Sequence, residues 1–169
     1  MNNGIEKKLC SKRRSDVIEA LYELSGDHSG IVKDVIKRHV LDLIGHSDAD
    51  IREKAVSLAG IHWRDVDAFP TILAFVAGDE RDQYVLTTVC AALGTLVVYN
   101  KLLDIGMVTQ LLAKVVVNEG LDPILRGTAY ISLQRISGRL TVAQYAQSSD
   151  DIERLSLDRP WLESLLNNE

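Results

Sequence analysis

Aromatic residues and proline are both scarce in this chain of 169 residues, in which Phe, Trp and Tyr make up 5% and proline occurs three times. A β-sandwich or barrel needs many turns and favours aromatic and β-branched residues. Leu, Val, Ile and Ala supply most of the 46% hydrophobic content instead. The composition therefore favours helices that pack through aliphatic side chains.

Cysteine is also rare, and Cys10 and Cys90 form no Cys-x-x-Cys motif, which argues against a zinc site or a thiol redox site. Cys90 lies in an apolar run, so we expect it to be buried and reduced. The four histidines show neither His-x-x-x-His nor Glu-x-x-His spacing. No Gly-x-Gly-x-x-Gly, phosphate-binding loop or Gly-x-Ser-x-Gly is present. We therefore expect no metal, no cofactor and no catalytic residue.

No stretch of the sequence suggests a membrane span or a secretory signal. The basic residues between Lys7 and Arg14 are not followed by a continuous apolar run. The most apolar region, Val85 to Tyr99, is interrupted by Thr and Gly, and a spanning helix needs about 20 apolar residues. We expect a cytosolic protein with no membrane partner.

Acidic residues outnumber basic ones by 24 to 19, and the excess is unevenly spread. Residues 1–38 contain eight Lys or Arg and six Asp or Glu, whereas residues 39–169 contain eleven and eighteen. Nucleic-acid phosphates would be repelled by so acidic a body. The charge therefore argues against nucleic-acid binding and favours a basic protein partner.

Apolar residues recur at intervals of three and four, which is the period of an α-helix. This spacing predicts helices over residues 17–24, 31–44, 51–59, 68–76, 85–98, 105–117 and 124–136. Glycines such as Gly30 and Gly78 follow several of these stretches, and Asp48, Asp79 and Asp122 precede the next, as helix capping favours. With no break in composition, we expect one all-α domain over residues 1–169.

A degenerate motif recurs along these helices: a position that is often Arg, an apolar residue three later, and another four after that. Its copies are Arg14, Val17 and Leu21; Arg52, Ala55 and Ala59; Leu86, Val89 and Leu93; and Arg126, Ala129 and Leu133. They are spaced 38, 34 and 40 residues apart, and Gly60 and Gly94 follow two of them. We expect each Arg to join neighbouring repeats by bonding an acid or backbone carbonyls near a loop.

The segment DADIREKA, from Asp48 to Ala55, resembles the opening of a HEAT repeat, in which Asp precedes Val-Arg-x-x-Ala. Ile124 to Ala129 is similar to it, and the resemblance covers roughly residues 14–138. It implies a right-handed α-α solenoid of about four HEAT-like helical pairs, because no pair buries its apolar stripe alone. Residues 141–169 depart from the motif and are predicted to form a C-terminal cap, with a last helix opening at Asp158.

The resemblance also implies that the second helix of each pair lines a concave face, while the turns between pairs stack along one edge. The acids of these turns are Asp48, Asp50, Asp79, Glu80, Asp82, Glu119 and Asp122. One interpretation is that all of them cap helices. A helix cap needs only one acid, however, and the turn with Asp79, Glu80 and Asp82 has three. We therefore predict that these turns form an acidic edge that binds a partner.

These features favour a protein-binding module, and we expect the protein not to be an enzyme. The acidic turns would steer a basic protein toward the edge, and Trp63, Phe75 or Tyr99 would anchor it. In size, charge and class the chain resembles immunity proteins that neutralise a basic toxin domain of the nuclease type. The alternative is a general scaffold or regulatory adaptor. HEAT-like bilin lyases and DNA glycosylases are the third possibility, although no pigment site and no basic concave surface are evident.

Overall fold

The computed structural model describes residues 2–27, 32–100 and 104–167, and within these ranges every regular element is a helix. The α-helices are α1 (Asn2–Leu9), α2 (Arg14–Ser25), α3 (Asp34–Ile44), α4 (Ala49–Val56), α5 (Phe69–Ala74), α6 (Gln83–Tyr99), α7 (Ile105–Val117), α8 (Pro123–Ile136), α9 (Val142–Gln147) and α10 (Arg159–Leu166). Short helical turns join some of them: η1 (Ser57–His62), η2 (Val66–Ala68), η3 (Phe75–Asp79) and η4 (Ile152–Arg154). The all-α prediction is confirmed. Gly30 and the predicted helix start at Ile31 lie outside the described residues.

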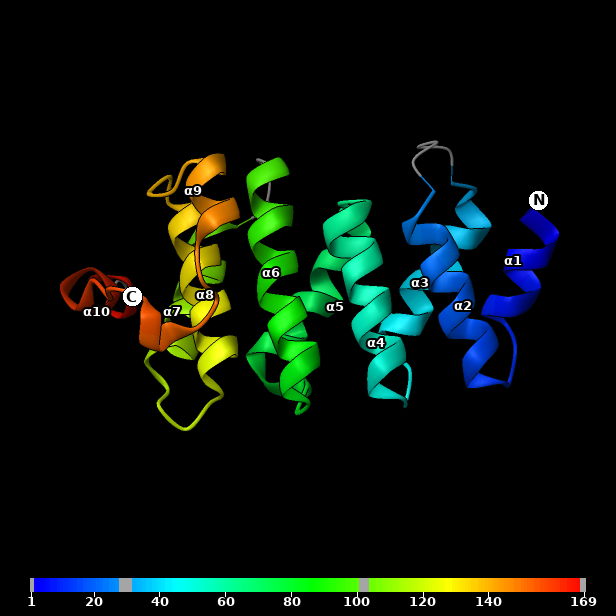
Figure 1. Cartoon of the computed structure of the whole chain (residues 1–169), viewed down its shortest axis with the longest axis horizontal. Coiled ribbons are helices and arrows are strands. Elements are labelled where there is room, and N and C mark those ends of the chain that lie inside the picture. Colours follow the sequence, from blue (N-terminus) through cyan, green and yellow to red (C-terminus); the bar gives the residue numbers. More distant parts are fainter. Residues whose placement is uncertain (1, 28–31, 101–103, 168–169) are drawn as a thin grey trace.

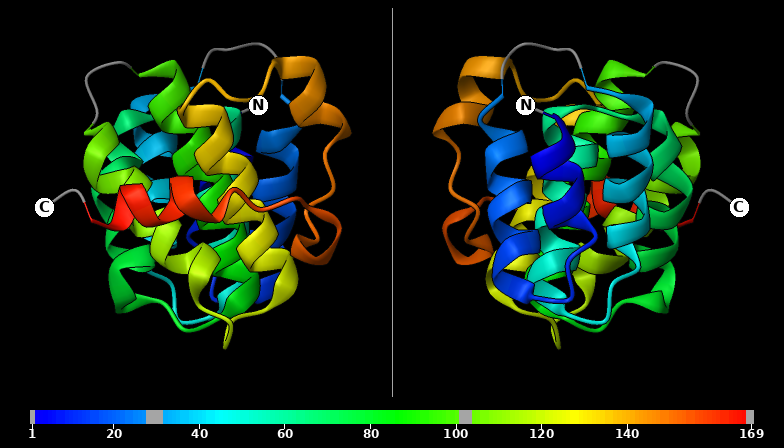
Figure 2. Two further views of the ribbon diagram at one scale, coloured as in Figure 1. Left: turned by 90° about the vertical axis from the view of Figure 1, so that its left-hand side faces the viewer. Right: turned by 90° about the vertical axis from the view of Figure 1, so that its right-hand side faces the viewer.

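The helices follow one another in chain order along the long axis of the molecule, so the two ends of the chain lie far apart (Figure 1). Helices α2, α4, α6 and α8 form one row, and consecutive members of this row contact each other. The end-on views in Figure 2 show a second layer of helices behind this row. The turns before α4, α6 and α8 lie along the same long edge (Figure 1). We call this the acidic edge and define it as residues 46–50, 79–82 and 118–122.

Aspartates start the three helices that rise from the acidic edge. The carboxylates of Asp48, Asp82 and Asp122 accept hydrogen bonds from backbone N–H groups in the first turn of α4, α6 and α8. Such caps satisfy donors that would otherwise lack a partner. The prediction that Asp79 precedes the helix as its cap is wrong, because Asp79 is the exposed last residue of η3, after Gly78 (φ 133°), and Asp82 caps α6.

Two glycines of the repeat motif allow α6 to lie very close to its neighbours in the row. A Cβ atom at Gly60 would lie 2.7 Å from Cβ of Ala92, and one at Gly94 would lie 2.8 Å from Cβ of Ser132. Gly60 follows the second motif copy, and Ala92 precedes the last position of the third. Gly94 and Ser132 stand in the same relation in the third and fourth copies. The repeated sequence pattern therefore corresponds to a repeated packing contact.

The C-terminal segment packs against the end of the row, and α10 lies across it in the left view of Figure 2. The buried hydroxyl of Tyr130 donates to the carbonyl of Ser156 (3.2 Å) and accepts from the N–H of Asp158 (3.0 Å). A Cβ atom at Gly127 would overlap the carbonyl oxygen of Asp150. The predicted last helix is confirmed, with Asp158 as its N-terminal cap.

Candidate functional site

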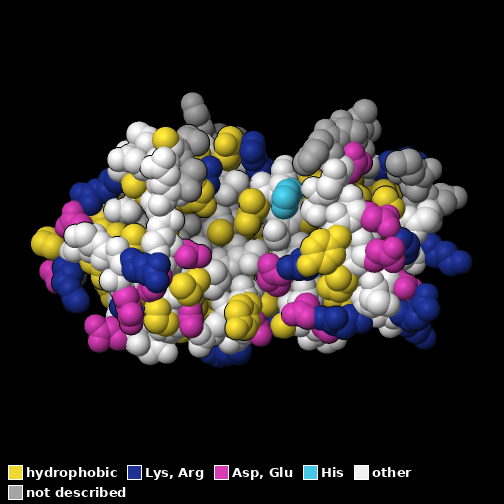
Figure 3. All heavy atoms as spheres, in the orientation of Figure 1, with side chains coloured by type: hydrophobic (Ala, Val, Ile, Leu, Met, Phe, Trp, Pro, Cys, Tyr) yellow, Lys and Arg dark blue, Asp and Glu magenta, His cyan; other side chains and the backbone are white. Residues whose placement is uncertain are grey.

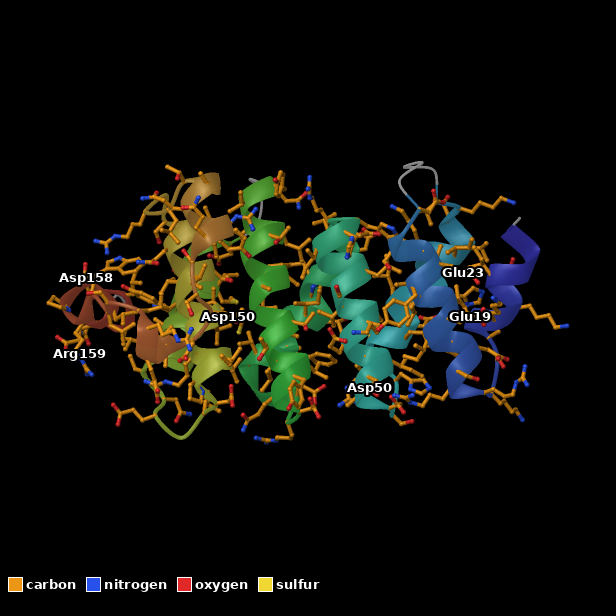
Figure 4. The ribbon with its side chains drawn as sticks, viewed as in Figure 1. Glu19, Glu23, Asp50, Asp150, Asp158 and Arg159 are labelled. Carbon is orange, nitrogen blue, oxygen red and sulfur yellow. The ribbon has the colours of Figure 1, made fainter. Side chains whose placement is uncertain are left out.

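Arginines of the repeat motif bind acids in the next turn along the acidic edge. Arg14 donates to Asp48 (Nε to Oδ2, 2.9 Å) and also pairs with Asp50, which Figure 4 labels at the start of α4. Burial alone would raise the pKa of Asp48, but the N–H of Ile51 and the Arg14 guanidinium outweigh it and lower the pKa. A charged contact therefore joins the start of α2 to the first turn of the acidic edge.

Arg52 makes the corresponding contact one repeat later and is more deeply enclosed. Its Nε and Nη2 donate to the two carboxylate oxygens of Glu80 at 2.6 and 2.9 Å, and Nη1 donates to the carbonyls of His46 and Ser47. The side chain of Glu80 is 5% exposed. The prediction that the repeat arginines join neighbouring repeats is confirmed for Arg14 and Arg52. Arg126 bears out the same prediction with a backbone carbonyl, because it donates to the carbonyl of Val116 (3.0 Å) at the end of α7, next to the loop before α8.

Glu80 is a structural acid, contrary to the expectation that it projects from the edge. Besides Arg52, the backbone N–H groups of Arg81 and Asp82 donate to its carboxylate, each at 2.8 Å. Burial alone would raise the pKa of Glu80, but these hydrogen bonds outweigh it and lower the pKa. Its charge is therefore already satisfied, which a count of acids along the sequence could not reveal.

The arginine series lapses at the third copy of the motif, where Leu86 takes the place of Arg. Beside Leu86 a groove of about 320 Å³ opens between η3 and α7. Its apolar lining residues include Phe75, Val76, Leu86, Leu111, Val115 and Leu121. Arg14 and Arg52 bind acids of the next turn in the first two motif copies, whereas an apolar groove lies beside the third.

The charges around this groove are mainly acidic. Asp79 and Glu119 are exposed at its two flanking turns, and neither forms an ion pair with any residue in the described ranges. The capping acids Asp82 and Asp122 stand in the same turns. Two cations, Arg81 and Lys114, line the groove. The two flanking turns, residues 79–82 and 118–122, together contain five acids and one cation, so the rim of the groove is acidic although Arg81 and Lys114 line it.

The predicted site residues are therefore only partly brought together. Phe75 and Glu80 line the groove, and Asp79, Asp82, Glu119 and Asp122 flank it. Asp48 and Asp50 lie on the same edge but are engaged by Arg14. Trp63 lies beyond η1, is half-buried against the core, and does not line the groove. Sequence reasoning missed Leu86 as a site residue, although its place in the motif was the available signal.

Among the described residues we find neither a reactive cysteine nor a metal-binding group at this edge. Cys90 also borders the groove, but it is buried, and burial raises the pKa of its thiol to about 12. Within residues 2–27, 32–100 and 104–167, no three His, Cys, Asp or Glu side chains are grouped so as to hold a metal ion. Among the described helices, none has both the length and the apolar character of a membrane span.

Comparison with known proteins finds no matching family, no similar curated protein and no similar solved structure.

Proposed function

We propose that the protein is a HEAT-like α-α solenoid of about four helical pairs, with residues 141–169 as its cap, and that it binds a basic protein at the acidic edge. One observation carries this proposal: the groove at Leu86 lies where the repeat arginine is missing, and acids flank it. A guanidinium or ammonium group of the partner would take the place that Arg14 and Arg52 fill in the preceding repeats. The apolar floor would accept the aliphatic stem of that side chain.

The most specific form of this function is an immunity or inhibitor protein that neutralises a basic toxin domain, of the nuclease type, by direct binding. The support for it is the small size of the chain, its net charge of −5 and the acid-flanked groove. Nucleases carry basic surfaces because they bind phosphates. The alternative remains a scaffold or adaptor in a larger complex. The identity of the captured partner decides between them.

The experiment is to capture the partner with the immobilised wild-type protein and to measure its association with variants. Leu86→Arg places a guanidinium beside the groove, at the motif position that Arg14 and Arg52 hold in the first two copies, where it would fill the hollow. We expect this variant to lose most of the affinity while remaining folded. Leu86→Met preserves the apolar floor and is the matched control, because Leu-to-Met changes usually cost less than about 1.5 kcal/mol.

A second arm tests the charge. Asp79→Lys with Glu119→Lys reverses two acids that neither cap a helix nor pair with a described cation. The control pair, Asp67→Lys with Glu153→Lys, makes the same change in net charge at exposed positions outside the acidic edge. We expect the first pair alone to slow association several-fold at low salt, since charges at the rim of an interface act mainly on the association rate. Equal rates for the two pairs, or full binding by Leu86→Arg, would contradict the proposal.

A further inference from the structure

Two arginines and two tyrosines stack on one another at the edge opposite the acidic edge. The guanidinium carbon of Arg64 lies 3.7 Å from the ring centre of Tyr99. That of Arg135 lies 5.7 Å from Tyr99 and 4.5 Å from Tyr145. The four residues come from separate elements: the segment after η1, the end of α6, the end of α8, and α9. We call them the stacked cluster.

The backbone at Arg64 is held in an unusual conformation. Its φ of 55° is the only positive value at a non-glycine residue within the described ranges. A left-handed conformation costs most side chains roughly 1 kcal/mol or more, so the surrounding structure must hold it. This conformation accompanies the close contact between the exposed Arg64 side chain and Tyr99, which is itself 52% exposed.

The guanidinium groups of the cluster carry no neutralising partner. No carboxylate in the described ranges forms an ion pair with Arg64 or Arg135, whereas several arginines elsewhere in the protein bind acids directly. Arg135 donates to the hydroxyl of Thr95 (3.3 Å). Stacking occupies the faces of a guanidinium and leaves its N–H edge available for the two oxygens of a carboxylate. The cluster is thus preorganised for oxyanions.

A second groove adjoins the cluster and shares Tyr145 with it. It has a volume of about 520 Å³ and runs over the face of η1, α6 and α8 that Figure 3 shows. Hydroxyl groups line it, among them Thr87, Thr88 and Ser148. Each of these three already donates its hydrogen internally, to Gln83, Glu53 and Gln144 respectively. Toward a ligand, these hydroxyl oxygens can therefore act only as acceptors.

We propose that the stacked cluster and this groove bind an extended acidic peptide segment of a partner protein. The arginines would hold its carboxylates, and the hydroxyl oxygens would accept hydrogen bonds from its backbone N–H groups. Asp150, which Figure 4 shows in front of α8, lies at the groove, so the glutamates of the segment would lie at the arginines and its neutral part in the groove. A nucleic acid carries a charge at every phosphate and would place some of them against Asp150. A single-stranded nucleic acid also needs open aromatic faces for its bases, whereas arginines already cover Tyr99 and Tyr145. This site is separate from the acidic edge and does not rest on the proposed function.

The test uses the full chain labelled with ¹⁵N and a set of ten-residue Gly/Ser peptides that carry two glutamates at separations of one to four residues. We expect at least one peptide to shift the Nε–Hε signals of Arg64 and Arg135 in a saturable manner. Arg64→Gln combined with Arg135→Gln should weaken this binding at least tenfold. Arg38→Gln combined with Arg159→Gln, at exposed arginines without an ion pair in the described ranges, removes the same charge and should change binding by less than twofold.

Arg135 is half-buried, so the exposed single variant Arg64→Gln guards against loss of fold and should weaken binding at least threefold. An oligothymidylate of ten nucleotides is the competing probe. The proposal is overturned if no peptide shifts the two arginine signals, or if the two double variants weaken binding equally. It is also overturned if the oligonucleotide shifts the same signals at lower concentration than every peptide, because the site would then be one for nucleic acid.

Discussion

Gly94→Ala is the substitution whose effect follows most directly from the packing of the helices. Gly94 is buried in α6 where this helix contacts α8. An added Cβ would lie 2.8 Å from Cβ and 3.3 Å from Cα of Ser132. Neither of these atoms can move by a side-chain rotation, so α6 and α8 must separate by several tenths of an ångström.

Two opposing terms set the magnitude of the effect. Overpacking of a core contact costs about 1–3 kcal/mol, and alanine gains about 0.5–1 kcal/mol over glycine inside a helix. We expect the first term to win, with a net loss of about 1–2 kcal/mol in the free energy of unfolding. In a domain of this size, 1 kcal/mol shifts Tm by roughly 2–4 °C, so Tm should fall by roughly 2–8 °C.

Gly4→Ala is the matched control, because a Cβ atom at Gly4 of α1 would meet nothing within 4 Å. This variant should be as stable as the wild type or slightly more stable. Ser132→Gly gives a second check, since it removes the Cβ and Oγ that the methyl group introduced by Gly94→Ala would meet. In urea unfolding, the double variant should lose at least about 1 kcal/mol less than the sum of the single variants. If Gly94→Ala matched Gly4→Ala, or if the two changes were additive, the inferred contact would be refuted.

Two further predictions concern the stability of the fold. Glu80→Gln should cost about 3 kcal/mol at neutral pH, because Arg52 would remain enclosed without its counter-charge. Because the pKa of Glu80 is lowered in the folded protein, the stability that its charge provides is complete above the unfolded-state pKa of about 4.3 and is lost as the pH falls through the lower folded value. The difference in unfolding free energy between the wild type and Glu80→Gln, measured in urea, should therefore narrow below pH 4. A constant difference from pH 7 to pH 3 would contradict this. Deletion of residues 150–169 removes the buried Ile152 and Leu162 and exposes Tyr130. Light scattering should therefore show that the truncated protein self-associates, and its Tm should be lower. Gly127→Ala should show a milder form of both effects, because the added methyl group displaces Asp150. A monomeric truncated protein with unchanged Tm would show that this segment is not a cap.

The long helices were predictable because their apolar stripes are strong and their flanking residues are informative. The predicted stretch 105–117 coincides with α7, and 124–136 differs from α8 by one residue. Helix α1 was not predicted, because Lys7 and Lys8 interrupt its short stripe. The short α9 was missed as well, although Thr141 and Gln144 form a capping box at its start. Local pattern therefore sufficed for the long, buried helices and for α10 with its Asp158 cap, and failed at the short helices α1 and α9.

The candidate site was less predictable, because burial of a charge depends on which residue reaches it from another repeat. Glu80 and Asp79 are adjacent acids in one turn, yet the first is enclosed by Arg52 and the second is exposed. The sequence contained part of the reason, since Arg52 occupies a repeat position. The stacked cluster gave no such signal, because Arg64, Tyr99, Arg135 and Tyr145 come together only through the packing of η1, α6, α8 and α9.

The two surfaces differ in how the protein uses its own charges. Along the acidic edge, carboxylates and arginines satisfy each other in the first two repeats, so these turns have little left to offer a partner. In the third motif copy Leu86 stands where the other copies have Arg, so this internal pairing stops. Glu119 forms no ion pair with any residue in the described ranges. At the opposite edge the arginines stack on tyrosines, an arrangement that fixes their position and leaves most of their hydrogen-bond donors available, apart from the Nη1 of Arg135 that donates to Thr95. Both surfaces therefore present charged groups that form no ion pair within the described ranges, Asp79 and Glu119 at the first and Arg64 and Arg135 at the second. Such groups gain the most when a partner of opposite charge binds.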